Sequence, residues 1–390
     1  MASPAKVLGD GGTGKTNAQA VAPEARIPVG ALGYMAPGEL PEFGYEAMVE
    51  LHFIDATHLL FAFNIEALLR RSDTCATAET QRKVRATVLA IPSGKVEKQA
   101  EWQLFHFADY LWSLGNGEFL LRRCSRLEVV GESLEPSPLI EAASEIEQIG
   151  FSPDRATMMV EEKSKQPARA SKPKKNPVFG PMGPPPPAVD VAFIGLHPLR
   201  MLSRAHLPFP AAVPLMDGGV LEVLAGPKKN WTIDLQPLGG TERKVATVQS
   251  ACRPRLTPIS SSVFLAGVCS RGGKQSFEGY DMKGLLLWRI RLGDQLYYPK
   301  LLLTRNGVHF AIESLHANRP LGALDPLSNT VIDGQMLDIY DTATGMKIGS
   351  LRITPAYTAG KNADFSPDGA RIAVLRDGAI EIYPVNGLRP

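Results

Sequence analysis

A hairpin-rich stretch near the end of the chain constrains the fold more than any other feature. Residues 362–385, NADFSPDGARIAVLRDGAIEIYPV, alternate short apolar runs with two turn signals. In the first turn, Pro367 presets the backbone angle and Gly369 can adopt a positive φ, and the Asp377–Gly378 pair is a strong signal for a tight hairpin. The stretch therefore predicts three successive antiparallel strands, which is most of one β-propeller blade.

Similar units recur upstream. Residues 336–351, MLDIYDTATGMKIGSL, predict a strand that ends at Asp341, a turn and an outer strand, and residues 149–162, IGFSPDRATMMVEE, repeat the Phe-Ser-Pro-Asp turn with Arg155 in place of glycine. Repeated short hairpin units are typical of radial β architectures. We therefore predict an all-β propeller, most simply with seven blades of four antiparallel strands, although six or eight blades stay open. The units begin near residues 48, 105, 146, 207, 251, 298 and 360.

The N-terminal part of the domain is expected to close the ring. The last unit offers only three strands before Pro390, and RIPVGALGY, residues 26–34, is the natural donor of the missing strand. The predicted organisation is a flexible extension over residues 1–24 and one propeller domain over 25–390. A Lys/Pro-rich insertion at about 161–188 cannot bury enough apolar surface to order itself and is expected to be disordered. A basic patch for an acidic partner, or a proline ligand for an SH3-like groove, are alternative interpretations of that segment.

These motifs resemble WD40-type repeats, in which a strand ending in Tyr-Asp precedes a Thr-Gly turn and an outer strand, and Phe-Ser-Pro-Asp-Gly opens the next blade. The match covers roughly the last sixty residues and is looser elsewhere, without the Gly-His dipeptide of the strict family. The chain is similar to bacterial WD40-like propeller proteins of unassigned function, many of which are exported. The resemblance implies that Asp341 caps a turn and binds no metal.

One motif points elsewhere. GDGGTGKT, residues 9–16, fits the nucleotide-binding pattern G-x-x-x-x-G-K-[ST]. Such a loop works between a buried strand and a helix whose N-terminus faces the phosphates. Here the preceding segment is too short for a central strand, and Pro23 limits any following helix to about one turn. We therefore interpret Gly9, Gly14, Lys15 and Thr16 as a chance match and disfavour a nucleotide hydrolase.

Composition excludes some classes and leaves the compartment open. A formal net charge of +2 over 390 residues argues against nucleic-acid binding through the whole surface. No apolar run is long enough to span a membrane. The N-terminus shows no apolar signal-peptide core, so localisation stays unknown, although similar propellers are often exported. Cys252 and Cys269 flank a turn and could form a disulfide, with buried free thiols as the alternative.

No catalytic, metal or cofactor residues are predicted. The histidines lack metal-ligand spacing; His52 and His58 bracket a turn that Asp55 is expected to cap. No G-x-S-x-G elbow is present. The tryptophans are irregularly spaced and are expected to pack between blades, not to cover a quinone. These four residues are Trp102, Trp112, Trp231 and Trp288.

The predicted function is a monomeric, non-enzymatic binding or scaffolding module that presents a ring face and loops to a protein or small ligand. Nucleic acid is not expected as a partner. The alternative is a propeller enzyme of the quinone-dependent dehydrogenase or lyase type, with its site at the central channel, because fold alone cannot choose between these classes. A funnel lined by several converging carboxylates, histidines or arginines would favour the enzyme, and an uncharged or solvent-filled channel would favour the binding module.

Overall fold

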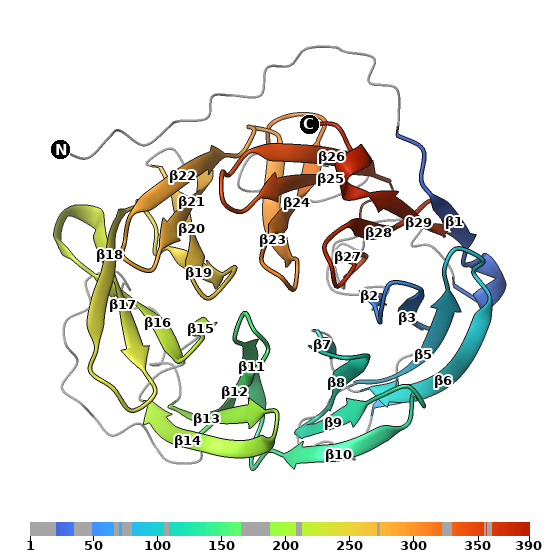
Figure 1. Ribbon diagram of the computed structural model, residues 1–390, viewed down its shortest axis with the longest axis horizontal. Helices are drawn as coiled ribbons and strands as arrows, with labels where there is room; N and C mark the ends of the chain where they lie inside the picture. The colour runs from blue at the N-terminus through green and yellow to red at the C-terminus, as the bar shows by residue number, and fades with distance from the viewer. Residues whose placement is uncertain are drawn as a thin grey trace.

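The computed structural model is a seven-bladed β-propeller (Figure 1). Each blade is an antiparallel sheet whose first strand lines the centre and whose last strand lies on the outside of the ring. The fold class and the blade number predicted from the hairpin units are confirmed. The structure describes residues 21–34, 49–65, 70–71, 80–104, 109–164, 188–207, 213–270, 274–321, 330–354, 356 and 361–390.

The first four blades follow one another along the chain. Blade 1 contains β2 (Glu50–Phe53), β3 (His58–Asn64), β5 (Thr80–Ala90) and β6 (Val96–Leu104), with a short β4 (Arg70–Arg71) paired to β5. Blade 2 contains β7 (Leu111–Gly115), β8 (Glu118–Arg123), β9 (Arg126–Val130) and β10 (Pro136–Glu141). Blade 3 contains β11 (Ile146–Phe151), β12 (Thr157–Lys163), β13 (Val189–Leu196) and β14 (Leu199–Leu207). Blade 4 contains β15 (Leu215–Met216), β16 (Gly219–Ala225), β17 (Asn230–Pro237) and β18 (Arg243–Gln249).

The last three blades complete the ring. Blade 5 contains β19 (Arg255–Pro258), β20 (Val263–Cys269), β21 (Gln275–Asp281) and β22 (Leu286–Arg291). Blade 6 contains β23 (Leu296–Leu303), β24 (His309–Ala317), β25 (Ile332–Asp341) and β26 (Lys347–Ile353). Blade 7 contains β27 (Ala363–Phe365), β28 (Arg371–Arg376), β29 (Ala379–Pro384) and β1 (Ala25–Pro28).

The ring is closed by the N-terminal strand, as the sequence predicts. β1 pairs antiparallel with β29, from Ala25 opposite Ile382 to Pro28 opposite Ala379. The rest of the predicted donor segment forms a short 3₁₀ helix, η1 (Gly30–Leu32), instead of a longer strand. Because a strand from one end of the chain completes the sheet from the other end, unfolding of either end opens the ring.

Two predicted segments lie outside the described residues. The nucleotide-loop match, Gly9, Gly14, Lys15 and Thr16, is one of them. Most of the Lys/Pro-rich insertion is the other; β12 continues to Lys163 and β13 begins at Val189, so the insertion connects the second and third strands of blade 3. The disorder of this insertion and the flexibility of the extension therefore stay predictions.

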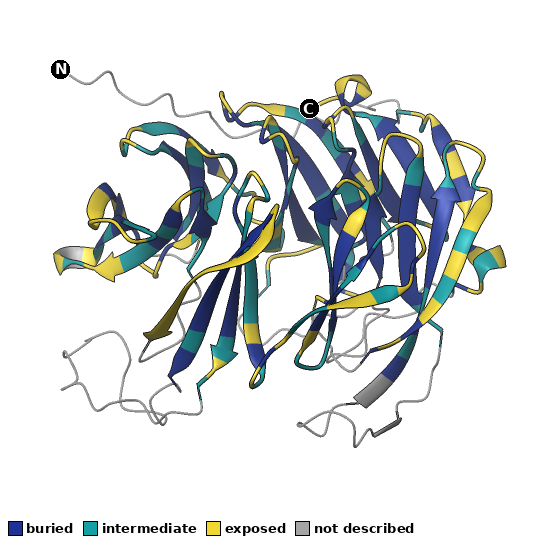
Figure 2. Cartoon of the chain, turned by 60° about the horizontal axis from the view of Figure 1, so that its bottom comes forward, coloured by how far each residue is buried: buried dark blue, intermediate teal, exposed yellow. Residues whose placement is uncertain are grey.

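Apolar side chains fill the seams between neighbouring blades. Trp288 of blade 5 stacks on Phe310 of blade 6, with ring centroids 5.5 Å apart, and its indole N–H donates to the carbonyl of Thr342 at 2.9 Å. Burying an aromatic side chain of this kind contributes about 2–3 kcal/mol. Figure 2 shows buried residues within the sheets and exposed ones along the outer strands. The predicted packing role is confirmed for Trp288 and for Trp102, which packs against blade 2.

A disulfide joins Cys252 and Cys269, whose Cα atoms are 5.8 Å apart. It links the segment before β19 to the end of β20, so the pairing that the sequence left open is present. A cross-link closing a loop of this length contributes about 3 kcal/mol by restricting the unfolded chain. Cys124 is also disulfide-bonded. In the described part of the chain, no helix is long and apolar enough to cross a membrane.

Candidate functional site

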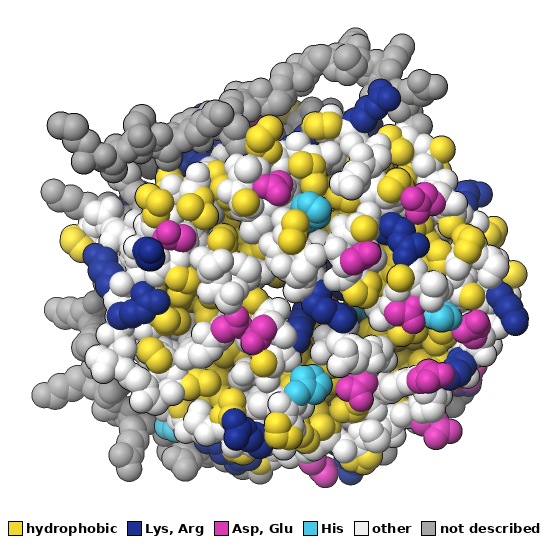
Figure 3. Space-filling model, viewed as in Figure 1, with side chains coloured by type: hydrophobic (Ala, Val, Ile, Leu, Met, Phe, Trp, Pro, Cys, Tyr) yellow, Lys and Arg dark blue, Asp and Glu magenta, His cyan; other side chains and the backbone are white. Residues whose placement is uncertain are grey.

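The turns between the first and second strands of the blades lie at one end of the ring, because the first strands all run in the same direction. We call this end the turn face; Figure 3 shows it. Adjacent turns contact each other: the Asn306 amide donates to the carbonyl of Asp368 at 2.9 Å, and the Arg371 guanidinium donates to the carbonyl of Ala56. The turns therefore support one another as a continuous surface. They comprise residues 54–57, 116–117, 152–156, 217–218, 259–262, 304–308 and 366–370.

Arg155 occupies a left-handed backbone position on this face. Its φ is 59°, in the turn between β11 and β12, where the equivalent turn of blade 7 has Gly369 with φ 72°. For a residue with a Cβ atom this conformation costs about 1–2 kcal/mol. The guanidinium carbon lies 4.8 Å from the ring centroid of Phe151, so the side chain rests on an aromatic face. A strained residue of this kind is a reason to look for a function.

Arg305 extends across the mouth of the ring. It lies in the turn between β23 and β24, and its Nη2 donates to Ser113 Oγ in β7 of blade 2 at 2.7 Å. Blades 7 and 1 separate blade 6 from blade 2, so this hydrogen bond joins blades that are not neighbours. The turn face has basic side chains at its middle, as Figure 3 shows.

The two arginines are close enough to affect each other. The pKa of Arg155 is lowered to about 10, first by partial burial and next by the positive charge of Arg305. Within the described residues, neither guanidinium has a carboxylate within the 4.0 Å of an ion pair. The mouth of the ring thus holds two cations that repel each other and that no anion among the described residues neutralises by direct contact.

A buried polar network lies between blades 7 and 1. His52 Nε2 is 3.0 Å from Glu50 Oε2, and His52 Nδ1 is 3.3 Å from Lys361 Nζ. Lys361 Nζ also donates to Asp364 Oδ1 at 2.5 Å. Because an ammonium group can only donate, Nδ1 of His52 accepts, and the imidazole proton lies on Nε2, where it faces Glu50.

Burial controls the titration of this network. It lowers the pKa of His52, with the charge of Lys361 adding to the effect, so the imidazole is neutral. It also raises the pKa of Glu50, with the Asp109 carboxylate as the next cause. Glu50 and His52 are each only 2% exposed, so a substrate cannot reach either group.

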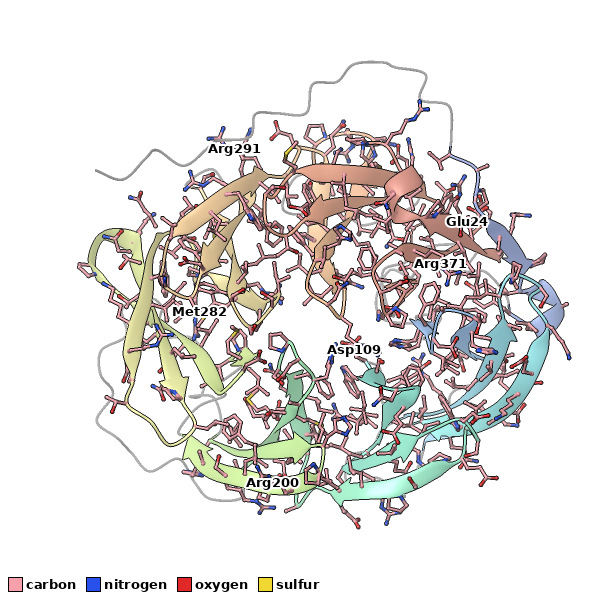
Figure 4. All side chains as sticks on the ribbon, viewed as in Figure 1. Glu24, Asp109, Arg200, Met282, Arg291 and Arg371 are labelled. Atoms are coloured by element: carbon pink, nitrogen blue, oxygen red, sulfur yellow. A yellow bond between two sulfur atoms is a disulfide. The ribbon has the colours of Figure 1, made fainter. Side chains whose placement is uncertain are left out.

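The contacts of this network are structural, because they connect neighbouring blades. The backbone N–H of Leu51 donates to the carbonyl of Lys361 at 2.8 Å, which ties blade 1 to blade 7. The His52 ring lies edge-on to Phe119 of blade 2, with centroids 5.5 Å apart. Asp109 stands at the inner edge of the ring (Figure 4). This network holds blades 7, 1 and 2 together.

Two carboxylates lie beside the arginine pair on the turn face. The backbone N–H of Asp154 points at Asp217 Oδ1, 3.5 Å away in the adjacent turn of blade 4. Burial, and next the hydrogen bond with Asp154, raise the pKa of Asp217. Asp217 therefore keeps its proton into the weakly acidic range, with Asp154 adding to the effect of burial.

Most residues that the sequence analysis singled out serve local structure. Asp55 caps its turn by accepting from the Thr57 N–H at 2.6 Å, and Asp341 caps its turn by accepting from the Thr344 N–H at 2.8 Å. His58 contacts Asp55 and Glu97, whereas His52 contacts Glu50, so the two histidines do not share these partners. In the part of the chain that the structure describes, no group of His, Cys, Asp or Glu side chains is arranged to hold a metal ion.

In the sequence, Arg155 stands out only as a departure from glycine, and Arg305 does not stand out. The available signal for Arg155 was that substitution itself, because a long cation at a left-handed turn position is unusual. For Arg305, the signal was a cation in the Arg-Asn-Gly hairpin turn of an inner strand. The sequence alone does not show that this turn lies at the mouth, because the mouth forms only when the ring closes.

Comparisons with known proteins agree with the fold. The chain is similar to the acylaminoacyl peptidase of Pyrococcus horikoshii, with a TM-score of 0.52 and 11% identity over 88% of this chain and 53% of that one. It is also similar to the WD40 domain of Toxoplasma gondii coronin, with a TM-score of 0.48 and 8% identity over 92% and 83% of the chains. A third similar structure is TolB of Acinetobacter baumannii, with a TM-score of 0.39 and 14% identity over 82% and 76%.

No family model matches the sequence. No curated protein matches it either. At these levels of identity, the structural likeness concerns the β-propeller fold and assigns no activity.

Proposed function

We propose that this propeller is a binding module that presents its turn face to a protein or small ligand. The observation that carries the proposal is the pair of arginines at the mouth, Arg155 and Arg305, which no carboxylate of the described residues neutralises by contact. Loops on a rigid scaffold are common carriers of binding function. The strained backbone of Arg155 supports the proposal, because folding alone would be served better by glycine there.

An enzyme with its site at the channel is the second candidate. Charged groups do converge on the mouth, which favours it, and the Asp154–Asp217 pair offers a proton at weakly acidic pH. Against it, the histidine and glutamate that could transfer protons are buried against each other. If the module is an enzyme that uses this pair, Asp217→Asn should abolish turnover of a bound ligand while leaving its affinity largely unchanged.

Site-specific photo-crosslinking in the cells that make the protein tests the binding proposal. A photoreactive phenylalanine derivative would replace Asn116 or Asn306, both exposed on the turn face. Matched controls would carry it at Arg200 or Arg291, which are exposed on the outer strands β14 and β22 (Figure 4). The proposal predicts discrete adducts from the turn-face positions only. Equal or stronger adducts from the outer rim would overturn it.

A further inference from the structure

The arginine pair narrows the chemistry of the ligand, on the premise that the turn face is a binding surface. The side chain of Arg155 makes no hydrogen bond to another described residue, and the side chain of Arg305 uses one donor on Ser113. A guanidinium has five N–H donors in a planar fork, and that fork matches the two oxygens of a carboxylate or the oxygens of a phosphate. Both arginines therefore keep guanidinium donors that no described residue accepts.

The charges around the two arginines favour a carboxylate ligand over a phosphate ligand. The charge of Asp364 acts on Arg155, and Asp154 and Asp217 lie in the turn of Arg155 and the one beside it. Asp364 partly offsets the positive charge of Arg155 without an ion-pair contact, and all three carboxylates would repel an anion that enters the mouth. A dianionic phosphate would meet more repulsion from them than a singly charged carboxylate would.

We propose that Arg155 and Arg305 together bind a carboxylate group, carried either by the acidic side chain of a peptide or by a free small acid. The carboxylate lies between the two guanidinium groups and relieves their mutual repulsion. Ser113 positions Arg305 by holding its Nη2 across the ring. Blades 3 and 6 each contribute one arginine and blade 2 the serine, so the site exists only in the closed propeller.

Calorimetric titration of the full chain tests this assignment. The probes are acetyl-hexaglutamate amide, succinate and inorganic phosphate, each at constant ionic strength because exposed charges are screened by salt. The variants are Arg155→Gln and Arg305→Gln, and the matched controls are Arg200→Gln and Arg291→Gln on the outer strands. The thermal midpoint and near-UV circular dichroism of each variant establish that it is folded.

The expected result is binding of a carboxylate probe that each mouth variant weakens about tenfold to a hundredfold, since a charge-assisted hydrogen bond is lost, while the controls leave it unchanged. Binding of the peptide much tighter than succinate identifies a peptide ligand, and comparable affinities identify a free acid. Tighter binding of phosphate, equal losses in the control variants, or no binding to the folded wild type would overturn the assignment. If these titrations fail while crosslinks still concentrate on the turn face, the binding module stands and only its ligand class is wrong.

Discussion

The turn of blade 3 and the turn of blade 7 have nearly the same construction and differ at one residue. In both, a buried serine hydroxyl donates to an aspartate two residues later, at 2.6 Å from Ser152 and 2.5 Å from Ser366. In both, that serine oxygen also accepts a backbone N–H from five residues later, at 3.0 Å and 2.9 Å respectively. The backbone geometry is therefore set by the shared Ser-Pro-Asp sequence.

The difference is Arg155 against Gly369. A Cβ at Gly369 would lie 3.2 Å from Thr304 Cγ2, because this turn packs on the turn of blade 6. The blade 7 turn is thus used for packing between blades. The blade 3 turn keeps the same frame under backbone strain and places a cation at the mouth. One motif can therefore serve structure in one blade and carry a binding residue in another.

Removing the shared serines should have the largest effect. Ser152→Ala and Ser366→Ala each leave a backbone N–H without its side-chain acceptor and remove one of the two hydrogen bonds that the aspartate accepts, so each should lower the free energy of unfolding by about 3 kcal/mol. Urea denaturation measures both values. Strongly unequal losses would show that the two turns are not equivalent supports.

Placing an arginine in the turn of blade 7 should have the next largest effect on the free energy of unfolding. Gly369→Arg combines left-handed strain with crowding against Thr304 and should lower the free energy of unfolding by about 2 kcal/mol. Gly369→Ala is the matched control, since it introduces the same strain and the same Cβ contact without the rest of the long side chain. A Gly369→Arg variant as stable as the wild type would mean that the contact with blade 6 is unimportant.

The reverse exchange should be favourable for folding. Arg155→Gly relieves the left-handed strain and loses the contact with Phe151, so the free energy of unfolding should rise by about 1 kcal/mol or slightly less. The same urea experiment measures it. A large loss of stability would instead assign Arg155 a structural role and weaken the case for a binding residue.

The smallest expected effect is on pH dependence. The pKa of Asp217 is raised in the folded protein, so its contribution to stability is present below its unfolded pKa of about 3.9 and is lost as pH rises through the folded pKa. Asp217→Asn should remove this decline in stability over weakly acidic pH. Asp368, in the other turn, has a lowered pKa through Ser366 and Ala370, so its contribution is lost on acidification instead. If the free energy of unfolding depends on pH in the same way in Asp217→Asn and in the wild type, the claim that Asp217 keeps its proton at weakly acidic pH is wrong.

The fold was largely predictable because turn chemistry is local. Pro367, Gly369 and the Asp377–Gly378 pair specify hairpins over a few residues, and the count of such units predicts the blades. The site was less predictable because it forms only when the ring closes. Arg305 and Ser113 are 192 residues apart in sequence, and His52 and Lys361 are 309 apart. No local sequence pattern links residues so far apart. Arg155, in contrast, is visible in the sequence because it replaces a turn glycine.

The most direct test of the arginine site is the side-chain nuclear magnetic resonance spectrum of the ¹⁵N-arginine-labelled protein during titration with succinate. The Nε–H signals of Arg155 and Arg305, assigned by the Gln variants, should shift together along one saturation curve, while those of Arg200 and Arg291 stay in place. Uniform shifts across all four, or no shift of the mouth pair at saturating succinate, would contradict the proposal that the mouth of this propeller binds a carboxylate.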